Sequence, residues 1–342
     1  MRTFAFAMLI IIAFTNRANA QQFVDKVKFF EDTAVVKATL TLNFRKLMLH
    51  VAREGMIFPA TFSCKTSDSL SVNDSISVEV RGHFRRTECY IPPLKLIYKN
   101  NPQAAFYHLK TLKLVSVCHL LETDEQNLLK EYLIYKMYNL ISDKSFRVRL
   151  LNLTYQDNSG TKKPITRYAF MLEDIKELAK RNNCVDWTDK KFTTENTDRE
   201  QMTRVAIFEY MIGNTDWSVP VNHNIKIVHT SSDSMSRPYV VPYDFDFSGL
   251  VNTSYSVPDE RLPITDVKQR LYRGFQRSEG EINKVLDVFN KQKDSIYAII
   301  NNCRLLWPTS KKSMMGYLDD FFDTIKKPWL IKQIFIDNAR TE

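Results

Sequence analysis

The sequence predicts an α+β protein with two lobes, the first β-rich and antiparallel and the second mainly helical. Segments in the first half alternate apolar and polar residues, as half-buried strands do. Segments in the second half repeat apolar residues at helical spacing. A length of 342 residues suits one two-lobed domain or two closely associated domains. We therefore predict a signal peptide over residues 1–20, a β-rich lobe with one long helix over 21–173, and a helical lobe over 174–342.

The first twenty residues have the pattern of a secretory signal peptide. Arg2 supplies a positive start, residues 4–14 form an apolar run, and residues 18–20 (Ala-Asn-Ala) resemble a cleavage site. The apolar run is too short to span a bilayer comfortably. We expect cleavage before Gln21 and export to the periplasm or the exterior, with an uncleaved N-terminal anchor as the alternative. No later stretch resembles a transmembrane segment.

The net charge favours acidic partners, and the spacing of the cysteines disfavours some kinds of site. The formal net charge is +9, which favours acidic partners such as phosphates, nucleotides or anionic glycans. No nucleic-acid-binding module is recognisable. The five cysteines form no C-x-x-C pair, which disfavours zinc and thioredoxin chemistry. Cys89 precedes one predicted strand and Cys118 ends another. If those strands pair antiparallel, the two cysteines lie at the same end, and a Cys89–Cys118 disulfide is expected; two buried thiols are the alternative.

The expected elements follow from these periodicities. In the first half, the predicted strands cover residues 35–44, 57–62, 76–80, 90–98, 112–117, 147–155 and 167–172, and residues 125–141 form the clearest helix, with a broad apolar face. The last two strands form a hairpin around the turn at residues 157–160. Residues 279–304, 310–325 and 328–339 repeat apolar residues as helices do.

Residues 205–250 carry the strongest chemical signal. A predicted helix from Val205 ends at Gly213, because Gly and Asn tolerate the left-handed turn that closes helices. A polar loop containing Asp216 and Asn224 follows. Two apolar strands, residues 225–228 and 239–243, then form a hairpin that ends in Asp244-Phe245-Asp246. The hairpin therefore brings two acidic clusters to one end, although isolated Asp residues at strand ends are also common chain punctuation.

Carboxylate and amide oxygens in this order fit a magnesium site used for phosphoryl transfer. Mg²⁺ takes hard oxygen ligands, usually one or two carboxylates together with waters and phosphate. Protein kinases use a catalytic Asp, an Asn a few residues later and a metal-binding Asp after a strand pair. In this order Asp216 would orient an acceptor hydroxyl. Asn224 and either Asp244 or Asp246 would hold the metal.

The stretch GNTDW…NHNIKI…VPYDFDFSG resembles the catalytic segment of the spore-coat CotH-like kinases, an atypical branch of the kinase-like fold. Over roughly residues 35–335 the chain more closely resembles a family of uncharacterised secreted bacterial proteins. The shared motifs resemble RGHFRR…C…PPLKL, YMIGNTDWSV and VPYDFDFSGLVN. The kinase resemblance implies a two-lobed atypical protein-kinase-like fold that binds ATP and Mg²⁺ and phosphorylates a protein or glycan hydroxyl.

The resemblance also implies roles in the N-terminal half. Arg85, in the loop after Gly82, would cover phosphates, and Lys95 would contact phosphate oxygens, with Lys113 as the alternative. Glu131 on the long helix would pair with Lys95, and the backbone at Glu173 would contact adenine. The loop departs from the CotH-like pattern, because His83 and Phe84 stand where small hydroxyl residues are typical. Each of these residues also has a purely structural alternative. Arg85 would then lie in a basic hairpin turn, Lys95 would face outward from its strand, and Glu131 would be a solvated charge on its helix.

Three other functions stay open from the sequence. ATP is scarce outside the inner membrane, so a non-catalytic envelope protein that binds a metal or a glycan is the main alternative. A hydrolase that pairs Asp216 with Asp244 or Asp246 is weaker, because glycosidases need a set carboxylate separation that sequence does not give. A triad of Ser218, His223 and Asp216 rests only on their closeness in the sequence.

Overall fold

We describe a computed structural model of the chain, in which residues 29–31, 33–53, 55–65, 71–82 and 84–341 are placed. The predicted signal peptide lies outside these residues. The chain forms two compact units, and it passes between them three times. The first unit runs to His119 and resumes over Arg149–Asp174, and the second comprises Leu120–Val148 and Ile175–Glu342.

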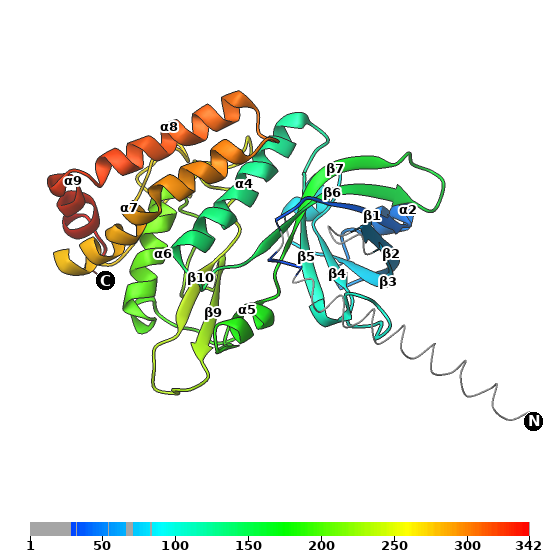
Figure 1. Cartoon of the computed structure of the whole chain (residues 1–342), viewed down its shortest axis with the longest axis horizontal. Coiled ribbons are helices and arrows are strands. Elements are labelled where there is room, and N and C mark those ends of the chain that lie inside the picture. The colour runs from blue at the N-terminus through cyan, green and yellow to red at the C-terminus, as the bar shows by residue number, and fades with distance from the viewer. Residues whose placement is uncertain (1–28, 32, 54, 66–70, 83, 342) are drawn as a thin grey trace, which may run out of the picture. The chain divides into compact units, whose positions relative to one another are not determined.

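A closed seven-stranded barrel forms the first unit (Figure 1). Its strand order is β1-β2-β3-β4-β5-β7-β6. The strands are β1 Val36–Leu42, β2 Ile57–Lys65, β3 Ser71–Val80, β4 Leu94–Ile97, β5 Thr111–Ser116, β6 Val148–Asp157 and β7 Ile165–Leu172. Short helical segments join them: α2 Phe44–Leu49, α3 Phe84–Glu88 and the 3₁₀ turn η1 Tyr107–Leu109. Alternate residues of β1, β2 and β3 are buried, so their apolar faces line the barrel core.

The predicted two-lobed kinase-like fold is wrong, because the β-rich unit is a closed barrel of mixed strand direction rather than an open antiparallel lobe. The closure comes from β1, which pairs parallel with β6 from Val36 opposite Leu151 to Leu42 opposite Asp157. Closing the sheet in this way removes both edges and their unpaired backbone groups. Alternating sequence identifies strands, but this closing pair joins segments more than a hundred residues apart, and local patterns carry no signal for it.

The predicted Cys89–Cys118 disulfide is confirmed. As expected, β4 and β5 pair antiparallel, with Leu94 opposite Leu114. The N–H of Tyr90 also donates to the carbonyl of Cys118 at 2.8 Å. The bridge therefore ties the segment after α3 to the end of β5 within the barrel unit.

The second unit packs helices beside a three-stranded sheet of order β10-β9-β8. Its strands are β8 Cys184–Asp186, β9 Ile225–Thr230 and β10 Tyr239–Pro242. Its helical segments are α4 Glu122–Ile141, α5 Ile175–Arg181, η2 Thr194–Asn196, α6 Arg199–Ile212, α7 Glu279–Asn302, α8 Pro308–Thr324, α9 Pro328–Lys332 and the π-helical turn η3 Gln333–Asp337. The long helix α4 belongs here, whereas the division at residue 173 had put it in the first lobe.

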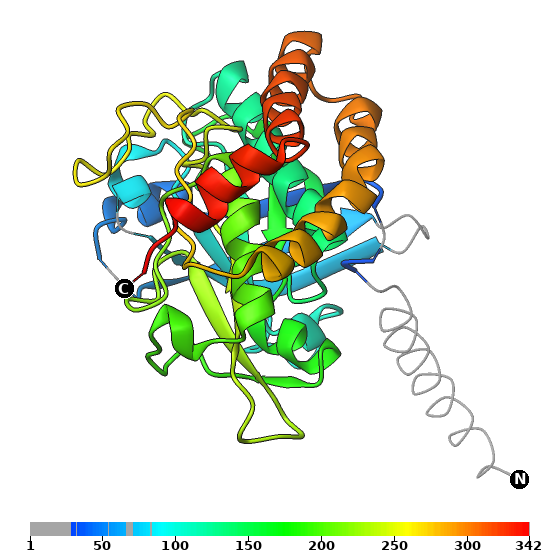
Figure 2. The same cartoon turned by 90° about the vertical axis from the view of Figure 1, so that its left-hand side faces the viewer.

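The helix that leads to the candidate site has defined ends. Asp198 caps α6 by accepting a hydrogen bond from the N–H of Gln201, and Gly213 closes it with a φ of 68°. The helix is buried on nearly every side, so it positions the loop that follows it. Figures 1 and 2 show the loop between β9 and β10 protruding away from α7 and α8, so the other end of this hairpin is the one near the helices. None of the helices described has the length and apolar character needed to cross a membrane.

Candidate functional site

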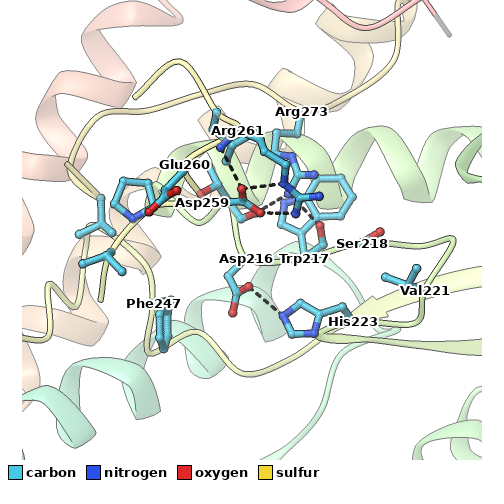
Figure 3. Close-up of a pocket in the computed structure, with 15 residues that line it drawn as sticks. Asp216, Trp217, Ser218, Val221, His223, Phe247, Asp259, Glu260, Arg261 and Arg273 are labelled. Atoms are coloured by element: carbon cyan, nitrogen blue, oxygen red, sulfur yellow. Dashed lines mark hydrogen bonds and ion pairs between the residues drawn. The ribbon is translucent and has the colours of Figure 1, made fainter. Parts of the chain in front are cut away.

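A large open cavity of about 1010 Å³ lies in the second unit, beside the loop between α6 and β9 (Figure 3). It is lined by Thr215, Asp216, Trp217, Ser218, Val221, His223, Phe247, Val257, Pro258, Asp259, Glu260, Arg261, Leu262, Val267 and Arg273. Asp216 and His223 are partly exposed in it, with 38% and 52% of their side-chain surfaces accessible. The cavity therefore offers a carboxylate and an imidazole to a ligand from solvent.

The loop that carries Asp216 is folded back on itself. Ser218 and His223 form a two-residue antiparallel bridge, with both N–H···O distances at 2.9 Å. Asn222 closes the turn with a φ of 54° and donates from its side-chain amide to the carbonyl of Thr188 at 2.8 Å. The fold-back brings Asp216 beside His223 and Asn224, which follow it by seven and eight residues in the chain.

Hydrogen bonds hold Asp216 on every side. Its Oδ1 lies 2.8 Å from Nε2 of His223, and Asn224 Nδ2 donates to its Oδ2 at 2.9 Å and to its backbone carbonyl at 2.8 Å. The N–H of Asp216 donates to Oδ1 of the buried Asn214 at 3.0 Å. Each carboxylate oxygen accepts more than one hydrogen bond, so Asp216 keeps capacity for a ligand donor.

Two glycines join the loop to the Asp-Phe-Asp segment. The N–H of Gly249 donates to the carbonyl of Gly213 at 3.0 Å. A Cβ at Gly213 would stand 2.0 Å from the hydroxyl of Tyr317, and one at Gly249 would stand 2.5 Å from the carbonyl of Val267. Neither position has room for a side chain, and the hydrogen bond between Gly249 and Gly213 shows that the two motif segments approach at backbone distance.

The Asp-Phe-Asp segment is anchored by its central residue. Phe245 is fully buried, with its ring centroid 4.8 Å from that of Tyr135 on α4. The N–H of Asp244 donates to the hydroxyl of Tyr135 at 2.8 Å, and Asp244 has a φ of 68°. The N–H of Tyr243 donates to the carbonyl of Asn224 at 3.0 Å. Asn224 and Asp244 therefore lie at the same end of the hairpin, as the sequence predicted.

The three predicted metal ligands differ in their surroundings. Asp246 is buried, and the hydroxyl of Tyr255 donates to its Oδ2 at 2.8 Å. Asn224 and Asp244 are half-buried. No group of three His, Cys, Asp or Glu side chains in the described part of the chain is placed to hold a metal ion. The side-chain oxygens of Asn224 and Asp244 are of the hard type that Mg²⁺ prefers, and a metal bound by them stays a prediction.

Lys95 and Arg85 both have partners inside the barrel unit. Lys95 Nζ lies 2.5 Å from a carboxylate oxygen of Glu79, the residue opposite it in the pairing of β3 with β4. Arg85, in α3, donates to the carbonyl of Ser116 at 2.8 Å. Both contacts stabilise the barrel, and whether either side chain also meets phosphate stays a prediction.

Glu131 and Glu173 are both buried carboxylates, but they belong to different units. Glu131 lies on α4 near Tyr135. Burial, then the charges of Glu131 and Asp244, hold the pKa of Tyr135 well above its usual range. Glu173 follows β7 at the point where the chain leaves the barrel unit. The predicted contact of its backbone with adenine stays a prediction.

The sequence did not predict two residues that contact the Asp216 loop, Arg273 and Asn214, or a buried acid near it, Glu209. Arg273 Nη1 donates to the carbonyls of Thr215 and Trp217, the latter at 2.9 Å. Glu209, on the last turn of α6, is 1% exposed, and burial raises its pKa to about 8. Asn214 accepts from Asp216 as described. Only Asn214 gave a signal, since it lies within the GNTD motif; Arg273 is some sixty residues away in the chain, and Glu209 resembles any helix glutamate.

Comparison with known proteins adds no assignment: no family model matches the chain, and a search of curated proteins finds no relative. The resemblance of the GNTDW and DFD segments to CotH-like kinases therefore stays a prediction.

Proposed function

We propose that the second unit binds a nucleoside triphosphate with a divalent cation and transfers its terminal phosphoryl group to a hydroxyl bound in the cavity beside Asp216. The proposal does not need a kinase-like fold. One observation carries the proposal. The side-chain amide nitrogen of Asn224 donates to the backbone carbonyl of Asp216 and to its carboxylate oxygen Oδ2. The amide oxygen of Asn224 is thereby oriented away from Asp216, at the hairpin end that also carries Asp244.

In the proposed reaction Asp216 acts on the acceptor. Its carboxylate accepts the hydroxyl proton as the acceptor oxygen forms a bond to the γ-phosphorus, while the bond from that phosphorus to the bridging oxygen of the diphosphate breaks. The products are a phosphate monoester and the nucleoside diphosphate. Catalysis in such a site comes from positioning and charge stabilisation. A bound Mg²⁺ would neutralise charge on the phosphate oxygens, with Asn224 and Asp244 as its protein ligands.

The positions of Ser218 and His223 disfavour a hydrolytic triad of Ser218, His223 and Asp216. Nε2 of His223 is engaged with Asp216, and Ser218 contacts His223 through backbone atoms. The hydroxyl of Ser218 lies apart from the His223 ring in Figure 3. Asp246, the other carboxylate proposed for a hydrolase pair, is buried against Tyr255.

The test measures the unfolding midpoint of the mature protein with ATP, with and without Mg²⁺ or Mn²⁺. A ligand at about 100 times its Kd stabilises the native state by about 2.7 kcal/mol. We expect a metal-dependent shift that Asn224→Ala and Asp244→Asn remove and Asp216→Asn retains. Transfer of labelled γ-phosphate to water or to the protein itself should fall about 10²–10⁴-fold in Asp216→Asn.

The matched control is Asp233→Asn. Asp233 lies in the loop at the opposite end of the same hairpin, where its carboxylate accepts only from the N–H of Met235. It should shift with ATP like the unmodified protein. No metal-dependent shift with any nucleotide would overturn the proposal, and it would favour the alternative of a non-catalytic protein that binds a metal or a glycan.

A further inference from the structure

Arg273 is the one side chain in the cavity that grips the backbone on both sides of Asp216 (Figure 3). Its Nη1 donates to the carbonyls of Thr215 and Trp217, and its guanidinium centre lies 5.4 Å from the centroid of the Trp217 ring. Arg273 is brought to the loop from a segment between Gly249 and α7. Its contact is therefore a tertiary clamp rather than a local turn.

Arg273 adds to the other contacts that hold the Asp216 loop. Asn214 holds the N–H of Asp216, and the bridge of Ser218 with His223 closes the far side. Without Arg273 the carbonyls of Thr215 and Trp217 would lose their charged donor. The backbone before and after Asp216 would then be held by the contacts of Asn214, Asn224 and the Ser218–His223 bridge, and we expect the Asp216 carboxylate to be less well fixed.

Arg273 is a cation in a partly buried place. Burial, together with the nearby Arg340, lowers the pKa of Arg273, while the charges of Asp216, Asp259 and Glu209 raise it. An arginine remains charged in such a site, and its rigid planar fork is ordered more easily than a lysine. Trp217, beneath the guanidinium, is buried and fixes the face on which it packs.

We propose that Arg273 is a positioning residue for Asp216, fixing the Thr215–Trp217 backbone so that the Asp216 carboxylate faces the cavity. The effect of Arg273 on catalysis rests on the proposed function, whereas its effect on the Thr215–Trp217 backbone does not. Arg273 touches no reacting atom in this assignment. It acts through the carbonyls that flank Asp216.

The chain offers two matched controls. Arg270 is another half-buried arginine, three residues away, which donates to the carbonyls of Met211 and Tyr317 and leaves the Asp216 loop untouched. Arg261 lines the same cavity, but it is exposed and pairs with Asp259. Arg270→Gln reports the cost of losing a buried arginine, and Arg261→Gln reports the loss of a positive charge from the cavity.

The experiment has one arm that needs no activity. Hydrogen exchange, measured by mass spectrometry on the full mature protein, should be about tenfold faster for peptides covering residues 214–219 in Arg273→Gln than in either control. Arg273→Lys, which keeps a charge but not the fork, should lie between. If Arg273→Gln does not fold, the comparison of Arg273→Lys with Arg270→Lys decides. Exchange equal to that of the controls would overturn the proposal.

The second arm uses Mg²⁺–ATP turnover. A small misplacement of a catalytic group costs about 100-fold, so kcat should fall by about that factor in Arg273→Gln while KM for Mg²⁺–ATP changes by less than about twofold. Millimolar guanidinium ion should restore part of kcat in Arg273→Ala and leave Asp216→Asn unchanged. Turnover in the unmodified protein with an unchanged kcat in Arg273→Gln would overturn the positioning role alone. No turnover in the unmodified protein would count against the proposed function, and the exchange arm would still decide on Arg273.

Discussion

Two groups of polar residues looked alike in the sequence and behave differently in the structure. Lys95 and Arg85 belong to the barrel unit, and each contacts the strand or carbonyl beside it in the barrel. Asp216 and Asn224 belong to the helical unit, where they bind each other and face a cavity or a hairpin end. In the first group the polar atoms hold the unit together. In the second they hold one another in a fixed geometry.

The difference shows what separates a structural polar contact from a candidate site. A strand lysine opposite a glutamate is explained by cross-strand pairing alone. Asn224 donates to both the carbonyl and the carboxylate of Asp216, so it holds the loop closed and also fixes the direction of its own amide oxygen. The second consequence is the one that a candidate site requires. The predictions that follow test whether the two groups are as separate as this comparison implies.

The largest expected effect concerns the bridge that secures the barrel. Removing it in the double variant Cys89→Ala, Cys118→Ala should lower the stability of the barrel unit by about 3–4 kcal/mol, because the bridge closes a loop of 29 residues. Chemical denaturation, followed with hydrogen exchange of each unit, measures the change. Exchange of residues 214–219 should not respond under native conditions.

The control for that variant is Cys303→Ala, since Cys303 is a free cysteine at the end of α7. It should be close to neutral. Faster exchange around Asp216 in the double variant as well would show that the effect of losing the bridge is not confined to the barrel unit.

A smaller effect should come from Glu209, the buried carboxyl beneath the Asp216 loop. Burial raises its pKa to about 8, against the opposing influence of the Asn214 side chain, so the folded chain keeps a proton that the unfolded chain releases near pH 4.5. Native stability should therefore fall as pH rises from about 4.5 to 8, by up to about 1.4 kcal/mol per pH unit. Glu209→Gln mimics the protonated acid and should remove this slope, so the variant should be more stable than the unmodified protein at pH 8.

Glu200→Gln should change the pH dependence of stability in the opposite direction. Lys284 holds the pKa of Glu200 below its usual range, so its contribution is present at neutral pH and is lost as pH falls. Urea denaturation of both variants across pH 5–8 makes the comparison. A slope that persists unchanged in Glu209→Gln would mean that other groups produce it and that the pKa of Glu209 is not raised in the folded protein.

The sequence patterns of neighbouring residues predicted many of the helices and strands, but they did not predict how the strands of the barrel assemble. The helix ending at Gly213 and the hairpin ending in Asp244 follow from capping and alternation, which are properties of neighbouring residues. The disulfide followed from one antiparallel strand pair. Closure of the barrel was missed, because β1 finds β6 across more than a hundred residues and in parallel. The start of β3 was missed too, since Ser71 and Asn73 look like loop residues until β2 pairs with them.

The candidate site divides in the same way. Asp216, Asn224 and Asp244 were found because the chain order of a loop and a hairpin fixes which residues share an end. Arg273 and Glu209 were not, since a tertiary clamp and a buried acid depend on packing between distant segments. Sequence reasoning therefore finds the residues that present chemistry sooner than the residues that keep them in place.

The smallest expected effect is the loss of the Lys95–Glu79 ion pair in the barrel unit. Lys95 and Glu79 are partly exposed, with 33% and 20% of their side-chain surfaces accessible, so breaking their ion pair should cost less than about 1 kcal/mol. If pairing is all that Lys95 does, Lys95→Met and Glu79→Gln should lower the unfolding midpoint equally and leave any Mg²⁺–ATP shift intact. Both variants would be measured by thermal unfolding with and without Mg²⁺–ATP. A nucleotide shift lost in Lys95→Met but kept in Glu79→Gln would instead support the predicted contact of Lys95 with phosphate, and the ion pair with Glu79 would not be the whole role of Lys95.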